Sequence, residues 1–319
     1  MKTFIRVAEV WAPSADGSLL ELRDGLFDAA PGFGASSRSL CFGRAEGLPG
    51  NAWEEGRPLL LSRLEGSYFR RTAAARAAGL TCAMALPIFV GERLTSVVVL
   101  LCGDSAEPEP SDGQVGAIEL WRNDPRVESD LRLAEGYFGA TDPGLEALSR
   151  DSFLPRGQGL PGLAWQREAA VFIEDIAASR HFLRAQAAAS AGIVRGLAQP
   201  CSTRTHQTWV VSLLSAPQSP IARRIESWLP DASGAALQRA FGFCETAGAL
   251  TAGAATAVPI NALGPVGAAW TSASAQVAHG AAVAGQDWSL HWPAAGLRSV
   301  LAIPLISEDR VSEVVALYF

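Results

Sequence analysis

The chain has 319 residues with a formal net charge of −6, of which 49% are hydrophobic and 18% charged. This length suggests two or three domains with substantial apolar cores. The acidic charge argues against non-specific nucleic-acid binding and against docking on an anionic membrane, because both need a basic surface. The first residues do not read as a signal peptide, and the longest apolar run, Val97–Cys102, is far short of a membrane span.

The cysteines favour a reducing compartment. Their number is odd, no CxxC spacing occurs, and three fall in the first third of the chain, so they mark no repeated disulfide or metal frame. We expect reduced, mostly buried thiols in a cytoplasmic protein. The five are Cys41, Cys82, Cys102, Cys201 and Cys244.

One glycine motif occurs three times, at Gly47–Trp53, Gly159–Trp165 and Gly264–Trp270. Each copy is followed by a further glycine and, eight residues after it, by a proline. The period of about 105–112 residues is too long for a solenoid repeat and matches a small domain. The sequence therefore predicts three tandem domains.

Each copy is predicted to begin with a β-hairpin. In the first copy, Val7–Trp11 and Leu19–Arg23 flank the turn pair Asp16-Gly17. Ser233-Gly234 takes this place in the third copy, and the second copy has an irregular loop around Asn123–Pro125.

A short helix, the glycine motif and a short strand follow. The helix is expected at Pro143–Ser152 and more weakly at Pro31–Ser39. The two glycines of the motif suit a tight turn, after which Ala-Trp opens a helix that packs on the sheet. The apolar stretches Pro58–Leu61 and Ala170–Ile173 are predicted strands.

An alanine-rich middle helix comes next, at Tyr68–Ala78 and His181–Ala191. Ser67 and Ser179 lie at or near the expected N-caps. A glycine at C′ closes each helix: Gly79 and Gly192.

A second hairpin closes each copy. Ala83–Val90 pairs with Leu94–Cys102, and Val300–Ile306 pairs with Val311–Phe319. The middle helix of the third copy is doubtful, because Trp288–Pro293 is short and interrupted by proline. Each copy is thus predicted to be an α/β domain of the α+β type around an antiparallel sheet.

The predicted domains span residues 1–106, 114–217 and 221–319. The segments between them, Asp104–Gly116 and Ser215–Arg223, are short, polar and rich in proline. A long signalling helix cannot run through either segment.

The second copy combines Glu119–Trp121, Leu131–Tyr137, Gly157–Trp165, Arg180–Ala185 and a closing hairpin. This combination resembles GAF domains of bacterial signalling proteins. The first copy is similar to a comparable degree, and the third is degenerate, matching mainly at its ends. The resemblance implies three tandem GAF-like domains, each a five- or six-stranded antiparallel sheet flanked by helices, with a pocket between the sheet and the middle helix.

The candidate ligand-binding residues surround this expected pocket. The recurring tryptophans either anchor the core or form a pocket wall. Arg195 begins a buried-looking strand and needs a partner, which is either an anionic ligand or an acidic residue such as Glu174 or Asp175. The other arginines suit a solvated helix face as well as a binding site. The candidates are Trp53, Tyr68, Phe69, Arg70, Cys82, Trp165, His181, Phe182, Arg184 and Arg195.

The resemblance does not identify a cofactor. GAF domains of different families bind cyclic nucleotides, bilins, haem or small metabolites, or bind nothing and mediate dimer contacts, and the fold does not choose among these. No Cys-His pair for a bilin is present, and no histidine has metal-ligand spacing. His291 lies near the place where haem-binding GAF sensors hold a proximal histidine, but a lone histidine in a Trp-rich loop is more often packing or surface.

An enzymatic role has little support in the sequence. Hydrolytic triads, paired carboxylates and phosphate loops have no matching motif. Free methionine sulfoxide reductases of the GAF family carry a cysteine in the glycine motif, where this chain has Asn51, Leu163 and Ala268. Cys82 near Met84 keeps a thiol-based redox sensor or reductase as a remote alternative.

The sequence favours a cytoplasmic, non-enzymatic sensory module that binds a small molecule and signals to an output domain or partner protein. The alternative is a protein-interaction or dimerisation scaffold whose pockets are filled by their own side chains. A collapsed interior between sheet and helices favours the scaffold. The chain would be either the input half of a longer protein or a module that acts through rearrangement of its domains.

Overall fold

The computed structural model describes residues 2–103, 115–250, 257–280 and 296–319. Its strands form three antiparallel sheets, which define three units: unit 1 contains β1–β6, unit 2 contains β7–β12 and unit 3 contains β13–β19. The predicted class, with helices and an antiparallel sheet in every repeat, is confirmed.

Unit 1 has the strand order β3-β2-β1-β6-β5-β4, with its first and last long strands side by side in the middle. This order follows from two hairpins that pair with each other through β1 and β6. Its elements are β1 (Val7–Pro13), β2 (Leu20–Leu26), α1 (Pro31–Arg38), β3 (Cys41–Phe42), α2 (Gly47–Glu55), β4 (Leu59–Leu61), α3 (Thr72–Ala77), β5 (Cys82–Val90) and β6 (Arg93–Cys102).

Unit 2 repeats this arrangement in the order β9-β8-β7-β12-β11-β10. The two sheets therefore correspond strand for strand. Its elements are β7 (Gly116–Asn123), β8 (Leu131–Tyr137), α4 (Pro143–Asp151), β9 (Phe153–Leu154), α5 (Gly159–Arg167), β10 (Val171–Ile173), α6 (Ala185–Ser190), β11 (Arg195–Pro200) and β12 (Thr208–Ser215).

Unit 3 keeps the same order, β15-β14-β13-β19-β18-β17, and adds β16 beside β14. Its elements are β13 (Arg224–Pro230), β14 (Ala236–Cys244), β15 (Gly248–Ala249), β16 (Val258–Pro259), a 3₁₀ turn η1 (Ile260–Ala262), α7 (Pro265–Ser272), β17 (Gln276–His279), β18 (Ser299–Ser307) and β19 (Arg310–Tyr318).

The glycine motif differs from its predicted form, because the helix begins at its first glycine in units 1 and 2 and directly after it in unit 3. Gly47 takes a positive φ of 57° and opens α2, so the second glycine lies within the helix. A Cβ on Gly50 would meet the carbonyl oxygen of Gly43 at 2.0 Å, and equivalent carbonyls lie 2.4 and 1.8 Å from a Cβ at Gly162 and Gly267. The second glycine is therefore required by close packing of the helix on the preceding loop.

The middle helices begin later than predicted, at Thr72 in α3 and Ala185 in α6. The hydroxyl of Ser67 accepts a hydrogen bond from the Phe69 amide at 3.1 Å, and Ser179 forms the same bond two residues on. Each serine thus closes a short turn before the helix and does not cap it.

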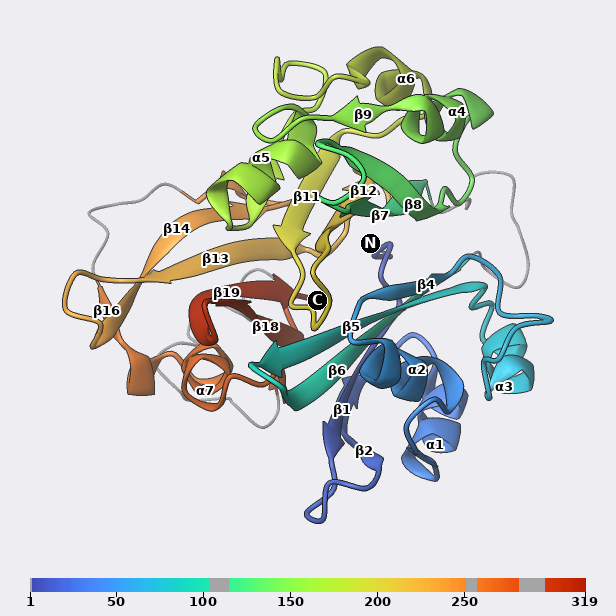
Figure 1. Cartoon of the computed structure of the whole chain (residues 1–319), viewed down its shortest axis with the longest axis vertical. Helices are drawn as coiled ribbons and strands as arrows, with labels where there is room; N and C mark the ends of the chain where they lie inside the picture. Colours follow the sequence, from blue (N-terminus) through green and yellow to red (C-terminus); the bar gives the residue numbers. More distant parts are fainter. Residues whose placement is uncertain (1, 104–114, 251–256, 281–295) are drawn as a thin grey trace.

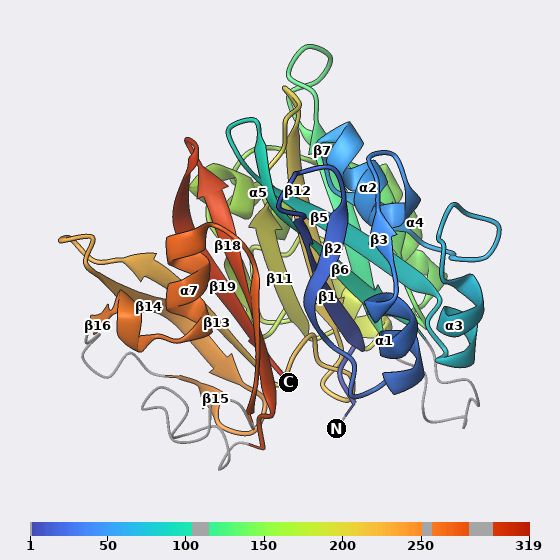
Figure 2. The ribbon, with the colours of Figure 1, turned by 90° about the horizontal axis from the view of Figure 1, so that it is seen from below.

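The three sheets face one another in the middle of the molecule, and the helices α1–α3, α4–α6 and α7 lie on the outside (Figures 1 and 2). One buried apolar cluster contains residues from all three sheets, including Leu100 of β6, Leu213 of β12 and Leu301 of β18. Separate clusters lie between each sheet and its own helices. Each sheet is therefore buried on both faces.

The units also follow one another around a closed ring. Strand β4 of unit 1 lies against β8 of unit 2, and β17 of unit 3 lies against β2 of unit 1. Between units 2 and 3, Phe172 of β10 stacks on Phe241 of β14, with ring centroids 6.0 Å apart. In each case an edge strand of one unit packs on the second strand of the next.

Some predictions concern segments that are not described. Most of Asp104–Gly116, all of Trp288–Pro293 and His291 lie outside the described residues. Among the described helices, none combines the length and the apolar character needed to cross a bilayer.

Candidate functional site

The interior of unit 1 contains a buried ion pair where a ligand pocket was expected. Glu9 and Trp11 are two residues apart on β1 and so lie on the same face of the sheet, toward the helices. Arg71, at the start of α3, donates from Nη2 to Glu9 Oε2 at 2.9 Å, and its Nη1 bonds the other carboxylate oxygen and Ser37 Oγ. Trp11 Nε1 donates to Glu9 Oε2 at 3.0 Å.

This ion pair is sealed from solvent by aromatic rings. Glu9 is 0% exposed and Arg71 is 4% exposed. The Arg71 guanidinium carbon lies 4.6 Å from the ring centroid of Phe33 and 5.1 Å from that of Phe69, with two further rings within 5.9 Å. Both terminal nitrogens of Arg71 are hydrogen-bonded, whereas its buried Nε makes no hydrogen bond among the described residues. The paired carboxylate and the surrounding rings compensate the buried charge. The chain's own side chains thus occupy this space.

Unit 2 repeats the cluster with the same residue types. Arg184 Nη2 donates to Glu119 Oε2 at 2.9 Å, and Trp121 Nε1 donates to the same oxygen at 3.0 Å. Ser149 Oγ donates to Glu119 Oε1 at 2.8 Å. Arg184, a predicted ligand-binding residue, therefore neutralises a buried carboxylate of its own unit.

Unit 3 keeps the acid and the tryptophan but pairs the acid differently. Trp228 Nε1 donates to Glu226 Oε2 at 3.2 Å, and the Tyr318 hydroxyl donates to the same oxygen at 2.7 Å. The positive charges come from residues of the sheet. Arg239 Nη1 lies 3.2 Å from Glu226 Oε1, and Arg224 forms an ion pair with the same oxygen. The cluster of this unit lies nearer its sheet than those of units 1 and 2.

Sequence reasoning did not single out this cluster, although its signal is present. Glu-x-Trp recurs at the start of every copy, and an acid between apolar strand residues needs a buried partner. Arg71 and Arg184 each stand eight residues before the glycine that closes the middle helix, Gly79 and Gly192. The recurring Glu-x-Trp and the recurring arginine eight residues before the glycine thus both point to the ion pair in the sequence of units 1 and 2.

Four of the predicted site residues lie against this interior. Phe69 and Phe182 are buried in the clusters between sheet and helices, as is Trp53 of α2. Trp165 packs against the same cluster of unit 2 and is half-buried. Their roles as ligand contacts stay predictions.

Three other candidates point away from the interior. Tyr68 is 44% exposed, and His181 is also exposed. Arg70 is exposed and lies 3.2 Å from Glu46. The structure does not bring these three together with Phe69 and Phe182.

Cys82 lies on the opposite face of its sheet, in the central cluster that the three units share. It faces Cys102 across β5 and β6, and both are free thiols. Burial raises the pKa of the Cys82 thiol well above its usual range. A thiol in this environment is a weak nucleophile.

Arg195 lies between units 2 and 3, and its partner is an acid. Its Nη2 is 3.4 Å from Glu245 Oε2 of unit 3, and its Nη1 donates to the backbone carbonyl of Glu174. The guanidinium carbon also lies 4.7 Å from the ring centroid of Phe243. Of the two partners considered for Arg195, the acidic side chain is present, although it comes from the next unit.

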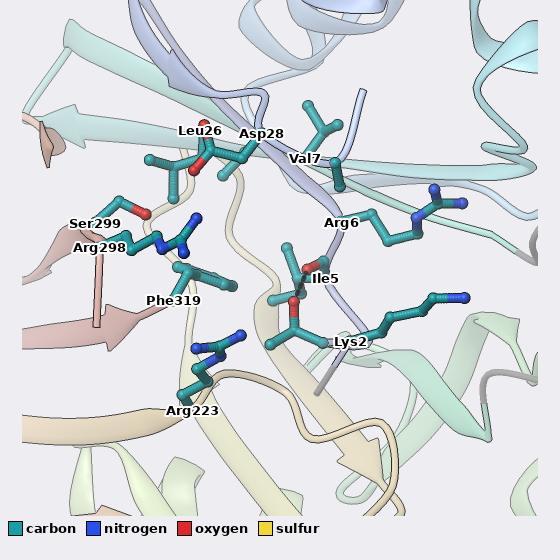
Figure 3. A pocket seen from close by; sticks show the side chains of 13 residues that line it. Lys2, Ile5, Arg6, Val7, Leu26, Asp28, Arg223, Arg298, Ser299 and Phe319 are labelled. Atoms are coloured by element: carbon teal, nitrogen blue, oxygen red, sulfur yellow. Dashed lines mark hydrogen bonds between the residues drawn. The ribbon is translucent and has the colours of Figure 1, made fainter. Parts of the chain in front are cut away.

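Three cavities lie where units meet. A cavity of about 550 Å³ between units 1 and 2 is lined by Arg57 and Glu135, among others. Another of about 310 Å³ lies between Phe89, Trp209 and Ile306, at the ends of the closing hairpins. The third, of about 450 Å³, lies between units 1 and 3 (Figure 3). A further cavity of about 640 Å³ is open to solvent beside α7.

No family model matches the chain, and no curated protein matches it. Among solved structures, the A. aeolicus Nlh2 GAF domain in an inactive state is 20% identical over 32% of this chain and 59% of its own, with a TM-score of 0.26. Free methionine-R-sulfoxide reductase from Neisseria meningitidis, in complex with its substrate, is 19% identical over 31% of this chain and 51% of its own, with a TM-score of 0.24. The GAF domain from Acinetobacter phosphoenolpyruvate-protein phosphotransferase is 12% identical over 32% and 56%, with a TM-score of 0.24.

The chain thus spans roughly half to three-fifths of these three solved chains, and each match covers about a third of it. Several of the matched structures are GAF domains. All three units combine a sheet of the same strand order with helices on its outer face, and this pattern of sheet and helices fits GAF-like domains.

Proposed function

We propose that the chain is a non-enzymatic regulatory module that senses a small molecule where its GAF-like units meet. The observation that carries this proposal is a contrast between the interior of each unit and the seams, which are the places where two units meet. Units 1 and 2 fill their interiors with the Glu9–Arg71 and Glu119–Arg184 pairs, whereas cavities of ligand size lie between units.

A ligand at a seam would be sensitive to the arrangement of the units, because its contacts come from two of them. Binding then favours the arrangement that contacts the ligand best. The central apolar cluster contains residues of all three units, so we expect a change at one seam to reach the others. An output domain or partner protein would detect this rearrangement, and a homodimer is a further possible output.

The proposal includes a cytoplasmic, bacterial setting. All five cysteines are free, which fits a reducing compartment.

A thermal-shift screen of the purified chain against nucleotides, amino acids, tetrapyrroles and fractionated cell extract tests this function. A ligand that binds only the folded state raises the melting temperature. An absorption spectrum reports haem or bilin directly, and native mass spectrometry reports other co-purifying ligands. If no compound or fraction stabilises the chain, the sensing function has no support.

The filled interiors favour a second candidate, a protein-interaction scaffold. In that case the units would keep one arrangement in all conditions. Small-angle scattering and hydrogen exchange with and without extract fractions separate the two, since only a sensor changes on addition of a metabolite.

A further inference from the structure

The cavity between units 1 and 3 combines a basic rim with an apolar wall. In unit 1 the lining residues come from the N-terminal segment, β1, the end of β2 and the loop after β2. In unit 3 they lie directly before β13, at the start of β18 and directly after β19. The apolar wall includes Ile5, Val7 and Leu26 from unit 1 and Phe319 from unit 3. Neither unit forms this cavity alone.

The charge around this cavity is opposite to that of the whole chain. The net charge of the chain is −6, yet the cavity is lined by four basic residues and one acidic residue, Asp28. The basic residues are Lys2, Arg6, Arg223 and Arg298.

The two arginines of unit 3 reach into the cavity. Figure 3 shows Arg298 and Arg223 extending toward its middle on either side of Phe319, whereas Arg6 and Lys2 extend to the other side. Arg223 donates to the Gly296 carbonyl at 2.8 Å. Among the described residues, the Arg298 guanidinium makes neither a hydrogen bond nor an ion pair, so its five N–H donors are available to a ligand.

We propose that this cavity binds an organic anion, with a carboxylate or phosphate head on Arg298 and Arg223 and an apolar body against Ile5, Leu26 and Phe319. Guanidinium groups bind both kinds of head through paired hydrogen bonds, which are stronger than neutral ones. A volume of about 450 Å³ is within the range of small-molecule sites.

This inference rests on the proposed function and assigns it one seam and one class of ligand. The anion would neutralise arginines of unit 3 while its body contacts unit 1, so its binding stabilises the closed seam between them. A ligand that contacted one unit alone would give no such coupling.

Isothermal titration with matched pairs of compounds tests the site. The pairs are 2-naphthoate with 2-naphthamide and adenosine 5′-monophosphate with adenosine, and inorganic phosphate is the bare anion. At least one organic anion should bind, and its neutral counterpart should bind about tenfold more weakly or worse, because the charge-assisted bonds are lost. The carboxylate and phosphate arms show which head the site prefers.

Three variants locate the binding. Arg298→Gln should weaken the anion about 10- to 100-fold and leave the neutral compounds unchanged. Ala29→Trp, at an exposed lining position, should block the cavity without removing a charge. Arg310→Gln is the control, because Arg310 is an exposed arginine of the same unit that pairs with Glu308 on the β18–β19 turn.

The proposal is overturned if no organic anion of the panel binds, if the neutral compounds bind as tightly, or if Arg298→Gln binds like the unaltered chain. The proposed function fails separately. If an extract fraction stabilises Arg298→Gln and the unaltered chain equally, the seam is wrong and sensing stands. If no fraction stabilises either chain, both are wrong.

Discussion

Arg70 and Arg71 are adjacent in the chain, yet their surroundings are opposite. Arg70 is exposed and pairs with Glu46 on the surface, whereas Arg71 is enclosed with Glu9 under four aromatic rings. Surface pairs contribute little to stability, but removing one partner of a buried pair leaves an uncompensated charge. Their substitutions should therefore have very different effects.

Arg71→Met is expected to lower the free energy of unfolding by about 3–5 kcal/mol, because Glu9 is left buried without its partner. Arg70→Met is the control and should change it by less than about 0.5 kcal/mol. Urea unfolding followed by circular dichroism measures both. The double variant Glu9→Gln with Arg71→Met should cost less than the sum of the single variants. Equal costs for Arg70 and Arg71 would contradict the importance given to the buried pair.

The interior and the seams differ in how far the sequence could predict them. The repeated units were predictable because turn pairs such as Asp16-Gly17 and the recurring glycines act locally. The Glu9–Arg71 pair spans 62 residues, and only its repetition in unit 2 reveals it. Arg195 shows the remaining difficulty, since its acidic partner Glu245 belongs to another unit and no local pattern points to it.

A histidine at the seam between units 3 and 1 makes stability depend on pH. His279 Nε2 of β17 lies 3.4 Å from Asp24 Oδ1 of β2. The hydrogen bond with Asp24 raises the pKa of His279, Asp28 adds to the rise, and burial and Arg38 oppose it. Because the folded pKa exceeds the ordinary value, this contribution is fully present below about pH 6.5 and is lost as the pH rises through the raised pKa.

His279→Gln should therefore destabilise the chain most near pH 5.5 and progressively less toward pH 9. The half-exposed pair limits the difference to less than about 1 kcal/mol. Unfolding curves of both chains across this pH range measure it. His181→Gln is the control, because His181 is exposed and its side chain makes no hydrogen bond in the described structure. A difference that stays constant with pH would exclude the His279–Asp24 contact as its source.

At the scale of the secondary-structure elements, two helical glycines of unit 1 differ in what surrounds them. Gly32 of α1 has open space where a Cβ would be, whereas a Cβ on Gly50 of α2 would meet the Gly43 carbonyl oxygen at 2.0 Å. Alanine at Gly32 should stabilise the protein, because it restricts the backbone of the unfolded chain and meets no neighbour in the folded one. The crowded site can accept a side chain only if α2 moves away from its loop.

Gly32→Ala should raise the free energy of unfolding by about 0.4–1 kcal/mol. Gly50→Ala should lower it by about 1–3 kcal/mol, the usual cost of overpacking a tight contact. The two variants make the same chemical change in helices of the same unit, and thermal unfolding compares them directly. Stabilisation by both would show that the contact of α2 with Gly43 is not tight.

The three seams use equivalent positions with different chemistry. Glu313 of β19 accepts a hydrogen bond from the Ala170 amide at 2.8 Å, and Ser96 of β6 accepts one from the Ala275 amide at 3.1 Å. The two acceptors stand at matching places. Glu313 comes one residue before Val314, which pairs with Trp228, and Ser96 comes one residue before Val97, which pairs with Trp11. Burial raises the pKa of Glu313.

The seam between units 1 and 2 lacks both the donor and the acceptor of this hydrogen bond. Pro58 has no N–H to donate, and the acceptor position holds Trp209, whose ring centroid is 5.0 Å from the guanidinium carbon of Arg57. Donor and acceptor have been lost together at this position, so Pro58 adds no unpaired amide here. The Leu60 amide instead donates to Glu135 Oε2 of unit 2 at 3.0 Å, while the buried indole N–H of Trp209 makes no hydrogen bond among the described residues. Divergence between the copies has thus kept the three seams and changed the interactions that form each of them.

At the scale of the whole molecule, the apolar run that closes unit 1 explains why this unit packs against the other two. Val97–Cys102 is apolar at every position, which indicates a strand buried on both faces. The sequence therefore predicts a cover on each face but not its identity, because helices and a second sheet bury the same side chains equally well. In the structure, one face lies under the helices of unit 1 and the other faces units 2 and 3.

Leu100 and Leu101 separate these two faces. Both are almost completely buried in β6, but Leu100 belongs to the cluster shared by all three units and Leu101 to the cluster of unit 1 alone. Either leucine replaced by alanine should cost about 2–5 kcal/mol. Native-state hydrogen exchange should distinguish them, because exchange reports local opening in each element. Leu100→Ala should speed amide exchange in β12 and β19 as well as in unit 1, whereas Leu101→Ala should speed it first in β1, β5 and β6. Identical exchange patterns would mean that the three units open as one body whichever face is weakened, and a change confined to unit 1 in both variants would mean that the shared cluster does not couple them.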